Sequence, residues 1–209
     1  MANSMIKNIN KVVNQAREKY NDLMESEYIG KDMLVDGVAT KGQMEENERA
    51  TTLKQERTRR MTCLLNCTVR RGSHIKIKNN TTADDYDLEG VVMSDPSLTP
   101  VDWFFSVLLF NTTVTRHRKQ LIYAPNGDII GDNPLIIDEI PCFVQRVGMR
   151  ERQLDAGIDR DSVNELITIN KWDIKKNDIL YVGKDRYRVT DIEEIDKEIF
   201  SAYMTYYRE

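Results

Sequence analysis

The sequence has few of the residues that most often carry chemistry. Its 209 residues include two histidines, three cysteines and five prolines. Three cysteines cannot all pair within one chain, so we expect reduced thiols in a cytoplasmic setting. The longest apolar run, WFFSVLLF at 103–110, has eight positions and contains a serine, whereas a membrane-spanning helix needs about 20 apolar residues. The first residues lead into a polar amphipathic stretch and not into the apolar core of a signal peptide. These features predict a soluble protein.

Charge is plentiful but nearly balanced. The chain is 31% charged and 40% hydrophobic, and its net charge is −4. It can therefore bury a core of modest size. A net negative charge argues against a protein whose main task is gripping phosphate backbones, although local basic patches remain compatible with it.

No arrangement of residues indicates catalysis or metal binding. His74 and His117 have no serine or cysteine nucleophile in a recognisable context. Cys63 and Cys67 have no second pair of ligands for zinc. The stretch DRDSVNE at 159–165 has valine at a ligand position of a calcium loop and lacks its central glycine. We expect no catalytic residue, no metal and no cofactor; an enzyme that uses Cys142 or His117 is the remaining alternative.

The N-terminal segment, residues 1–27, is predicted to be an amphipathic helix. Its apolar residues recur in steps of three and four and so lie on one face; they are Ile6, Ile9, Val13, Ala16, Tyr20 and Leu23. An isolated helix of this length is marginal in water. The stripe is therefore expected to pack either on its own chain or on a neighbouring subunit.

The rest of the chain is predicted to be mainly β. Asp36-Gly37 between short apolar runs is a strong hairpin signal. Beyond it, strand-length runs alternate with turn residues, among them QLIYA, PLII, CFVQRV and ILYV.

A strand-turn-strand pattern occurs twice. VRRGS at 69–73 matches IKKND at 174–178, and a strand follows each copy. LEGVVMSD at 88–95 then matches DRYRVTDI at 185–192, and FFSVLL at 104–109 matches IFSAYM at 199–204. Either the chain contains a repeat, or two unrelated strand-turn-strand units look alike. A repeat predicts two tandem small antiparallel β-barrel modules, residues 28–115 and 116–209, because closing a sheet removes its edges.

These stretches resemble the head-completion, or stopper-like, neck proteins of tailed bacteriophages. VDGVATKG opens a hairpin, VRRGSHIKI leads into the last strands, and the segment 174–189 resembles the family's strand-turn-strand segment near the end of a small barrel. Members carry one barrel and lack the N-terminal helix. The resemblance implies a structural, non-enzymatic virion protein, assembled in the host cytoplasm as a homo-oligomeric ring of the head–tail connector. It implies portal, adaptor or tail proteins as partners, no membrane, and DNA passing nearby without sequence-specific binding.

Candidate interface or channel residues follow from this expectation. The basic pairs of the repeated turn are Arg70, Arg71, Lys175 and Lys176, and the helix contributes Ile6, Ile9 and Val13. The polar insertion NNTTADDYD at 79–87 contains Asp84 and Asp85. A loop of this length is expected to reach a neighbouring subunit or to repel DNA phosphates in a channel, unless it is an ordinary surface loop.

A nucleic-acid-binding β-barrel is the alternative function. It is suggested by the basic clusters RTRR at 57–60 and RHRK at 116–119, together with aromatic residues on strands that could stack on bases. A charged run is more often a solvated surface, and strand aromatics are more often core residues.

Overall fold

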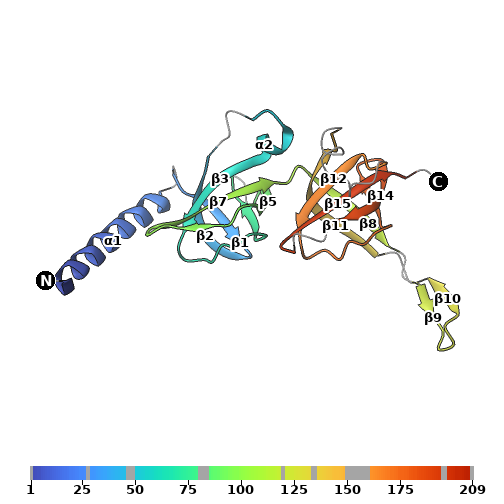
Figure 1. The fold of residues 1–209 in the computed structure, drawn as a ribbon, viewed down its shortest axis with the longest axis horizontal. Coiled ribbons are helices and arrows are strands. Elements are labelled where there is room, and N and C mark those ends of the chain that lie inside the picture. Colours follow the sequence, from blue (N-terminus) through green and yellow to red (C-terminus); the bar gives the residue numbers. More distant parts are fainter. Residues whose placement is uncertain are drawn as a thin grey trace. The chain divides into compact units, whose positions relative to one another are not determined.

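The computed structural model describes residues 2–26, 29–45, 50–79, 85–118, 121–132, 136–148, 161–193 and 197–207. The chain divides into two compact units, Met1–Leu109 and Phe110–Glu209. Each is a closed antiparallel barrel, and a helix precedes the first (Figure 1). The predicted mainly β fold with two tandem barrels is confirmed.

The first unit begins with α1 and continues as a barrel. Its elements are α1 (Ala2–Glu25), β1 (Lys31–Val35), β2 (Val38–Glu45), α2 (Leu53–Arg57), β3 (Thr58–Leu64), β4 (His74–Ile77), β5 (Leu88–Val92), β6 (Ser97–Leu98) and β7 (Asp102–Leu109). Six strands follow the order β3-β2-β1-β4-β5-β7, and pairing of β3 with β7 closes the ring. The short β6 pairs with β7 next to the β5 contact.

The β1–β2 hairpin forms where the sequence predicts it. Asp36 and Gly37 connect the strands with φ values of 50° and 86°, and Val35 pairs with Val38. Both residues tolerate the left-handed region better than others do, because glycine has no Cβ and a short Asp side chain can bond locally. This two-residue turn sets the register of the pair.

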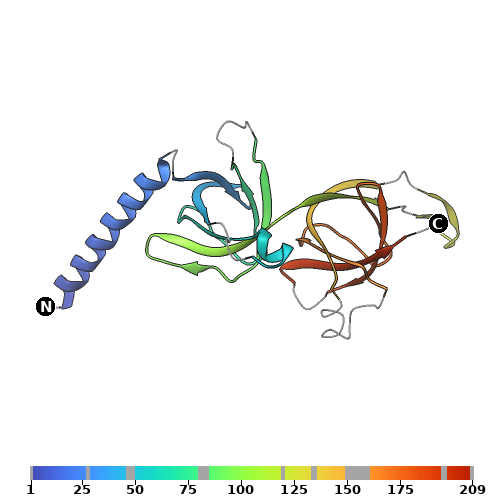
Figure 2. The same ribbon diagram turned by 90° about the horizontal axis from the view of Figure 1, so that it is seen from above.

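The second unit is a barrel with a separate hairpin. Its elements are β8 (Thr112–Arg118), β9 (Leu121–Tyr123), β10 (Ile129–Asp132), β11 (Ile136–Arg146), β12 (Asn164–Ile169), β13 (Ile179–Val182), β14 (Asp185–Ile192) and β15 (Ile199–Tyr206). Strands β11-β12-β15-β14-β13-β8 form the closed ring, visible from above in Figure 2, while β9 and β10 form a two-stranded sheet.

Two sequence-based expectations are corrected here. The boundary between the units lies after Leu109 and not at 115/116, because β8 pairs with β11 and β13 of the second barrel along its length. The runs PLII and CFVQRV contribute to one strand, β11. Pro141 lies close to the point at which β11 changes its partner from β8 (through Cys142) to β12 (from Phe143). A proline without an N–H is tolerated at such an irregular place in a sheet.

The two barrels share one circular strand order. If β1, β2, β3, β4, β5 and β7 are matched with β8, β11, β12, β13, β14 and β15, every neighbour relationship in one ring recurs in the other. Ile179 then takes the place of His74, an offset of 105 residues, and Asp185 takes the place of Leu88, an offset of 97. The difference of eight equals the excess of the connection 78–87 over the connection 183–184. The insertion therefore accounts for the whole change in offset between these strands.

The predicted match of the last strands is wrong by two residues. Val107 pairs with Val92 and Met204 pairs with Val189, so Val107 corresponds to Met204. The shared Phe-Ser letters had placed Leu109 there. A shift of two residues leaves the same side chains facing the core, because side chains alternate along a strand. Hydrophobic patterning alone could not reveal this error.

Each barrel has its own hydrophobic core. Buried side chains of the first include Met33, Met61, Ile75 and Phe105, and those of the second include Ile140, Leu166, Leu180 and Met204. Burying residues of this kind stabilises a fold by about 1.5–3 kcal/mol each. Among the described residues, no helix is long and apolar enough to cross a membrane.

Candidate interface surfaces

The turn that precedes β4 is built like the turn that precedes β13. In the first barrel the Arg70 backbone N–H donates to Ser73 Oγ (3.1 Å), and Gly72 and Val92 bond through the main chain (2.9 Å). In the second, the Lys175 N–H donates to Asp178 Oδ2 (2.8 Å).

The corresponding main-chain bond joins Asn177 to Val189 at 2.9 Å. Gly72 and Asn177 both have positive φ, 81° and 73°. Val69 and Ile174, which open the two turns, are both buried. The predicted repeat of this turn is therefore present in its hydrogen bonds as well as in its sequence.

The basic pairs on these turns have different surroundings. Arg70 is exposed, and Arg71 Nη1 donates to the Met93 carbonyl at 2.7 Å. Lys175 and Lys176 are exposed and face carboxylates, Lys175 that of Asp173 at 3.3 Å and Lys176 that of Asp191 at 4.0 Å. Each pair lies on its own barrel.

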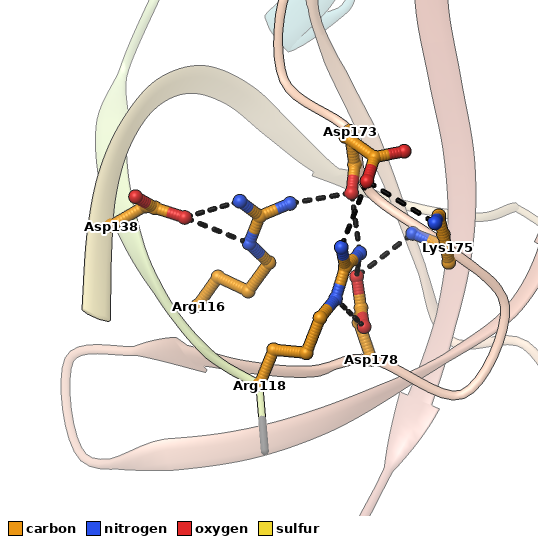
Figure 3. A network of polar contacts seen from close by, with 6 residues as sticks. All are labelled: Arg116, Arg118, Asp138, Asp173, Lys175 and Asp178. Atoms are coloured by element: carbon orange, nitrogen blue, oxygen red, sulfur yellow. Dashed lines mark hydrogen bonds and ion pairs between the residues drawn. The ribbon is translucent and has the colours of Figure 1, made fainter. Parts of the chain in front are cut away.

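A dense polar network holds the turn of the second barrel (Figure 3). Arg118 donates to Asp178 and Asp173, and Arg116 donates to Asp138 and to the Asp173 carbonyl (2.6 Å). The hydrogen bond from Arg118, followed by that from Lys175, lowers the pKa of Asp173, and the carboxylates raise the pKa of Arg118. These paired charges join β8, β11 and the turn.

Arg116 is nearly buried, its side chain only 8% exposed. Ladder register gives it the place of Val35 in the first barrel. A buried guanidinium needs charged and hydrogen-bonding partners, and Asp138 and the Asp173 carbonyl supply them. The second barrel therefore uses an ionic network where the first uses an apolar residue.

The apolar face of α1 is covered only toward its C-terminal end. Met24 is fully buried, and Tyr20 Oη donates to Asp102 Oδ2 at 2.9 Å. Burial, together with the Asp102 carboxylate, raises the Tyr20 pKa to about 12. Ile6 and Ile9 are 55% and 53% exposed, while Val13 is half-buried. Of the two alternatives for this stripe, packing on the same chain accounts for Tyr20, whereas Ala16 and Leu23 are exposed, as Ile6 and Ile9 are.

The insertion after β4 is described only at its ends. Asp84 lies outside the described residues, and Asp85 is exposed. The Asn79 N–H donates to Asp87 Oδ1 at 2.6 Å, so the two ends of the loop are tied together.

A basic and aromatic surface on the second barrel was not identified from the sequence. The sequence predicts RHRK as one basic cluster, but Arg116 and Arg118 turn toward carboxylates, whereas His117 packs on Tyr181 with ring centroids 4.2 Å apart. Next to Tyr181, β14 carries Arg186 and Arg188, both exposed. The alternation RYR at 186–188 was the available signal, because alternate residues of a strand share a face.

The three thiols are free and buried. Cys63 and Cys67 lie with their sulfurs 3.7 Å apart. Their shared hydrogen bond lowers the pKa of Cys67 and raises that of Cys63, and burial raises the pKa of Cys142 to about 12. Within the described part of the chain, no group of three or more His, Cys, Asp and Glu side chains is arranged to hold a metal ion.

Comparisons of the chain with protein-family models, with curated proteins and with solved structures found no match.

Proposed function

We propose that the chain is a structural assembly protein, in its specific form a ring-forming component of the head–tail connector of a tailed bacteriophage. The observation that carries the assembly role is the exposed apolar stripe on the first half of α1. The phage assignment rests on the resemblance of the segments around VRRGSHIKI and 174–189 to neck proteins, together with the two barrels of one topology.

The exposed stripe needs a partner for a physical reason. Ile6, Ile9 and Val12 are 55%, 53% and 64% exposed on a helix whose barrel contacts include Arg17, Tyr20 and Met24 in its second half. An amphipathic helix is stabilised mainly by what its apolar face packs on. Each of these side chains can contribute up to about 1.5–3 kcal/mol when it is buried.

The partner in this proposal is a second copy of the chain. The first half of α1 from one copy packs on its neighbour, and repetition of such a head-to-tail contact closes a ring. The tandem barrels supply the wall of the ring, and the turns with Arg70 and Lys175 lie on their surfaces.

Light scattering of the full-length protein tests the assembly. Wild type is expected to form a species of several subunits, and Ile9→Asp is expected to shift it toward monomer with an unchanged β-type circular dichroism spectrum. Gln15→Asp, the same new charge on the opposite, exposed face, is the matched control and should assemble like wild type. A monomeric wild type at all concentrations, or an Ile9→Asp variant that assembles normally, contradicts the proposal.

The virion role has a separate test. Mass spectrometry of purified phage particles should detect the chain as a structural component, and cryo-electron microscopy should place it between portal and tail. Its absence from mature particles would reject the phage assignment and leave the self-assembly result standing.

A further inference from the structure

We propose that the outer surface of β13 and β14 in the second barrel binds single-stranded nucleic acid. This cationic face is defined by Arg186 and Arg188 on β14, with Tyr181 and His117 beside them and Lys184 in the adjoining turn. Ladder register places His117, Ile179 and Arg188 in one row across β8, β13 and β14, and Thr115, Tyr181 and Arg186 in the next. Their core-facing neighbours Leu180, Tyr187 and Val189 are buried, so these rows point away from the core.

The arginine of the second row is held in place by stacking. Arg186 places its guanidinium carbon 5.5 Å from the Tyr181 ring centroid, and His117 packs on the same tyrosine. A guanidinium over an aromatic ring is favoured electrostatically and has fewer conformations to lose on binding. It can still donate hydrogen bonds to a phosphate in its own plane.

The first barrel provides an internal comparison. By ladder register Arg186 takes the place of Glu89, and Arg188 the place of Val91. Glu89 contacts both Lys76 (2.8 Å) and His74 (3.1 Å), so the lysine of that surface is paired with a carboxylate. On the equivalent face, the first barrel carries the Glu89–Lys76 pair, and the second barrel carries Arg186 and Arg188.

The spacing of the two arginines suits a phosphate chain. Arg186 and Arg188 are alternate residues of β14, which separates them by roughly 6.6 Å along the strand, and Lys184 lies in the adjoining β13–β14 turn. Two cations on one strand and a third in the turn beside them match a polymer with one negative charge per unit better than they match a single anion.

Acidic side chains lie beside this cationic face. Glu139 on β11 pairs with Thr115 at the far end of the second row, and Asp191 on β14 faces Lys176 at 4.0 Å. Glu139 therefore limits the cationic surface to the β13–β14 side of this face.

A shallow hollow at the end of β14 adjoins this face. Its volume is about 400 Å³, and it is lined by Lys184, Asp185, Arg186, Tyr206 and Tyr207. Tyr206 pairs with the core-facing Tyr187, and their ring centroids lie 5.0 Å apart, but Tyr206 is still 51% exposed at the barrel end. Bases that stack on aromatic side chains must be unpaired, and such stacking tolerates any sequence. The two arginines of β14 together with the exposed ring of Tyr206 therefore favour a single strand over a duplex.

Fluorescence anisotropy with the full-length protein tests this assignment. The probes are a labelled oligothymidylate, the matching oligouridylate and a labelled DNA duplex, each at 50 and 200 mM salt. The oligothymidylate is expected to bind more tightly than the duplex, and the oligouridylate arm distinguishes DNA from RNA. Arg186→Glu combined with Arg188→Glu should weaken binding at least tenfold and lower the slope of log affinity against log salt by about 1.4, since each single-strand phosphate contact contributes about 0.7.

Two further variants separate this site from general charge effects. Tyr206→Ala should weaken binding several-fold without changing the salt slope, because it removes stacking and no charge. The single variant Arg186→Glu should also weaken binding. Arg60→Glu, the same charge change at an exposed arginine on β3 of the other barrel, is its matched control and should bind like wild type. Failure of the wild type to bind at 50 mM salt, tighter binding of the duplex, or an equal loss in Arg60→Glu and Arg186→Glu would overturn the proposal. None of these outcomes depends on ring assembly.

Discussion

Arg118 and Asp178 are joined by two parallel hydrogen bonds, Nε to Oδ1 at 2.9 Å and Nη2 to Oδ2 at 2.5 Å. In the first barrel the residue in the place of Asp178 is Ser73, and its hydroxyl donates to Asp36 Oδ2 at 2.7 Å. In each barrel a side-chain hydrogen bond therefore joins the turn to the end of the first strand. In the first barrel the turn residue Ser73 is the donor, and in the second barrel the turn residue Asp178 is the acceptor. The second barrel makes this connection with an ion pair.

Removing the acceptor should destabilise the second barrel more than the equivalent change destabilises the first. Asp178→Ala leaves Arg118 without one carboxylate and the Lys175 N–H without its cap, an expected loss of about 2–4 kcal/mol. Ser73→Ala removes one hydrogen bond to the Asp36 carboxylate and one from the Arg70 N–H, but it leaves no buried charge unpaired and should cost about 1.5 kcal/mol. Urea unfolding followed by the fluorescence of Trp172 and Trp103, one in each barrel, measures both values. Equal losses would show that the ion pair adds nothing to the turn.

Gly72, whose backbone is left-handed, should tolerate substitution by asparagine better than substitution by alanine. Gly72→Ala places a Cβ at a φ of 81° and should cost about 1–2 kcal/mol. Gly72→Asn should cost clearly less, because asparagine already occupies the equivalent position at Asn177 with a φ of 73°. Thermal unfolding of the two variants measures the difference. If alanine and asparagine are equally tolerated, the turn of the first barrel changes its conformation.

The first barrel should lose stability in acid through Glu89. Burial raises the pKa of this carboxyl, but hydrogen bonds and charge from Lys76 and His74 outweigh it and leave the pKa below the usual 4.5. A carboxyl with a lowered folded-state pKa stabilises the fold above its unfolded pKa, and this contribution disappears as pH falls through the folded value.

Glu89→Gln should therefore destabilise the barrel at neutral pH and flatten the decline below pH 4.5. Unfolding free energies measured by Trp103 fluorescence between pH 7 and pH 3 test this expectation. Asp95→Asn, at an exposed carboxylate after β5, changes the charge equally without touching Lys76. If that control flattens the curve as much as Glu89→Gln does, the ion pair is not the cause.

Thiol reactivity should be confined to Cys67. It is 8% exposed and its pKa is lowered by the hydrogen bond with Cys63, whereas Cys63 and Cys142 are fully buried with raised pKa values. The thiolate is the reactive form. Iodoacetamide labelling of the native protein, read by mass spectrometry, should modify Cys67 first, and Cys63→Ser should slow that reaction. Labelling of Cys142 at the same rate would mean that the second barrel opens readily.

Local signals in the sequence were sufficient for the elements whose causes are local. The three-and-four spacing from Ile6 to Leu23 predicted α1, and Asp36-Gly37 predicted the first hairpin because those residues accept positive φ. The turns around Gly72 and Asn177 were visible for the same reason. Recognising them twice led to the tandem barrels, since each turn precedes a strand pair of one pattern.

Long-range pairing decided what those signals left open. Side chains alternate along a strand, so either Arg116 or His117 faces outward, but not both. The register of β8 against β11 and β13 decides which one, and the residues next to them in the sequence do not specify that register. The same holds for the two-residue shift of β15 and for the single strand β11, whose two halves find different partners. The sequence by itself determined the N-terminal helix, the turns and the fact that one strand-turn-strand pattern occurs twice. Closure of each barrel decided which charges became a buried network and which became a surface, because closure sets the register of every strand against neighbours distant in the chain.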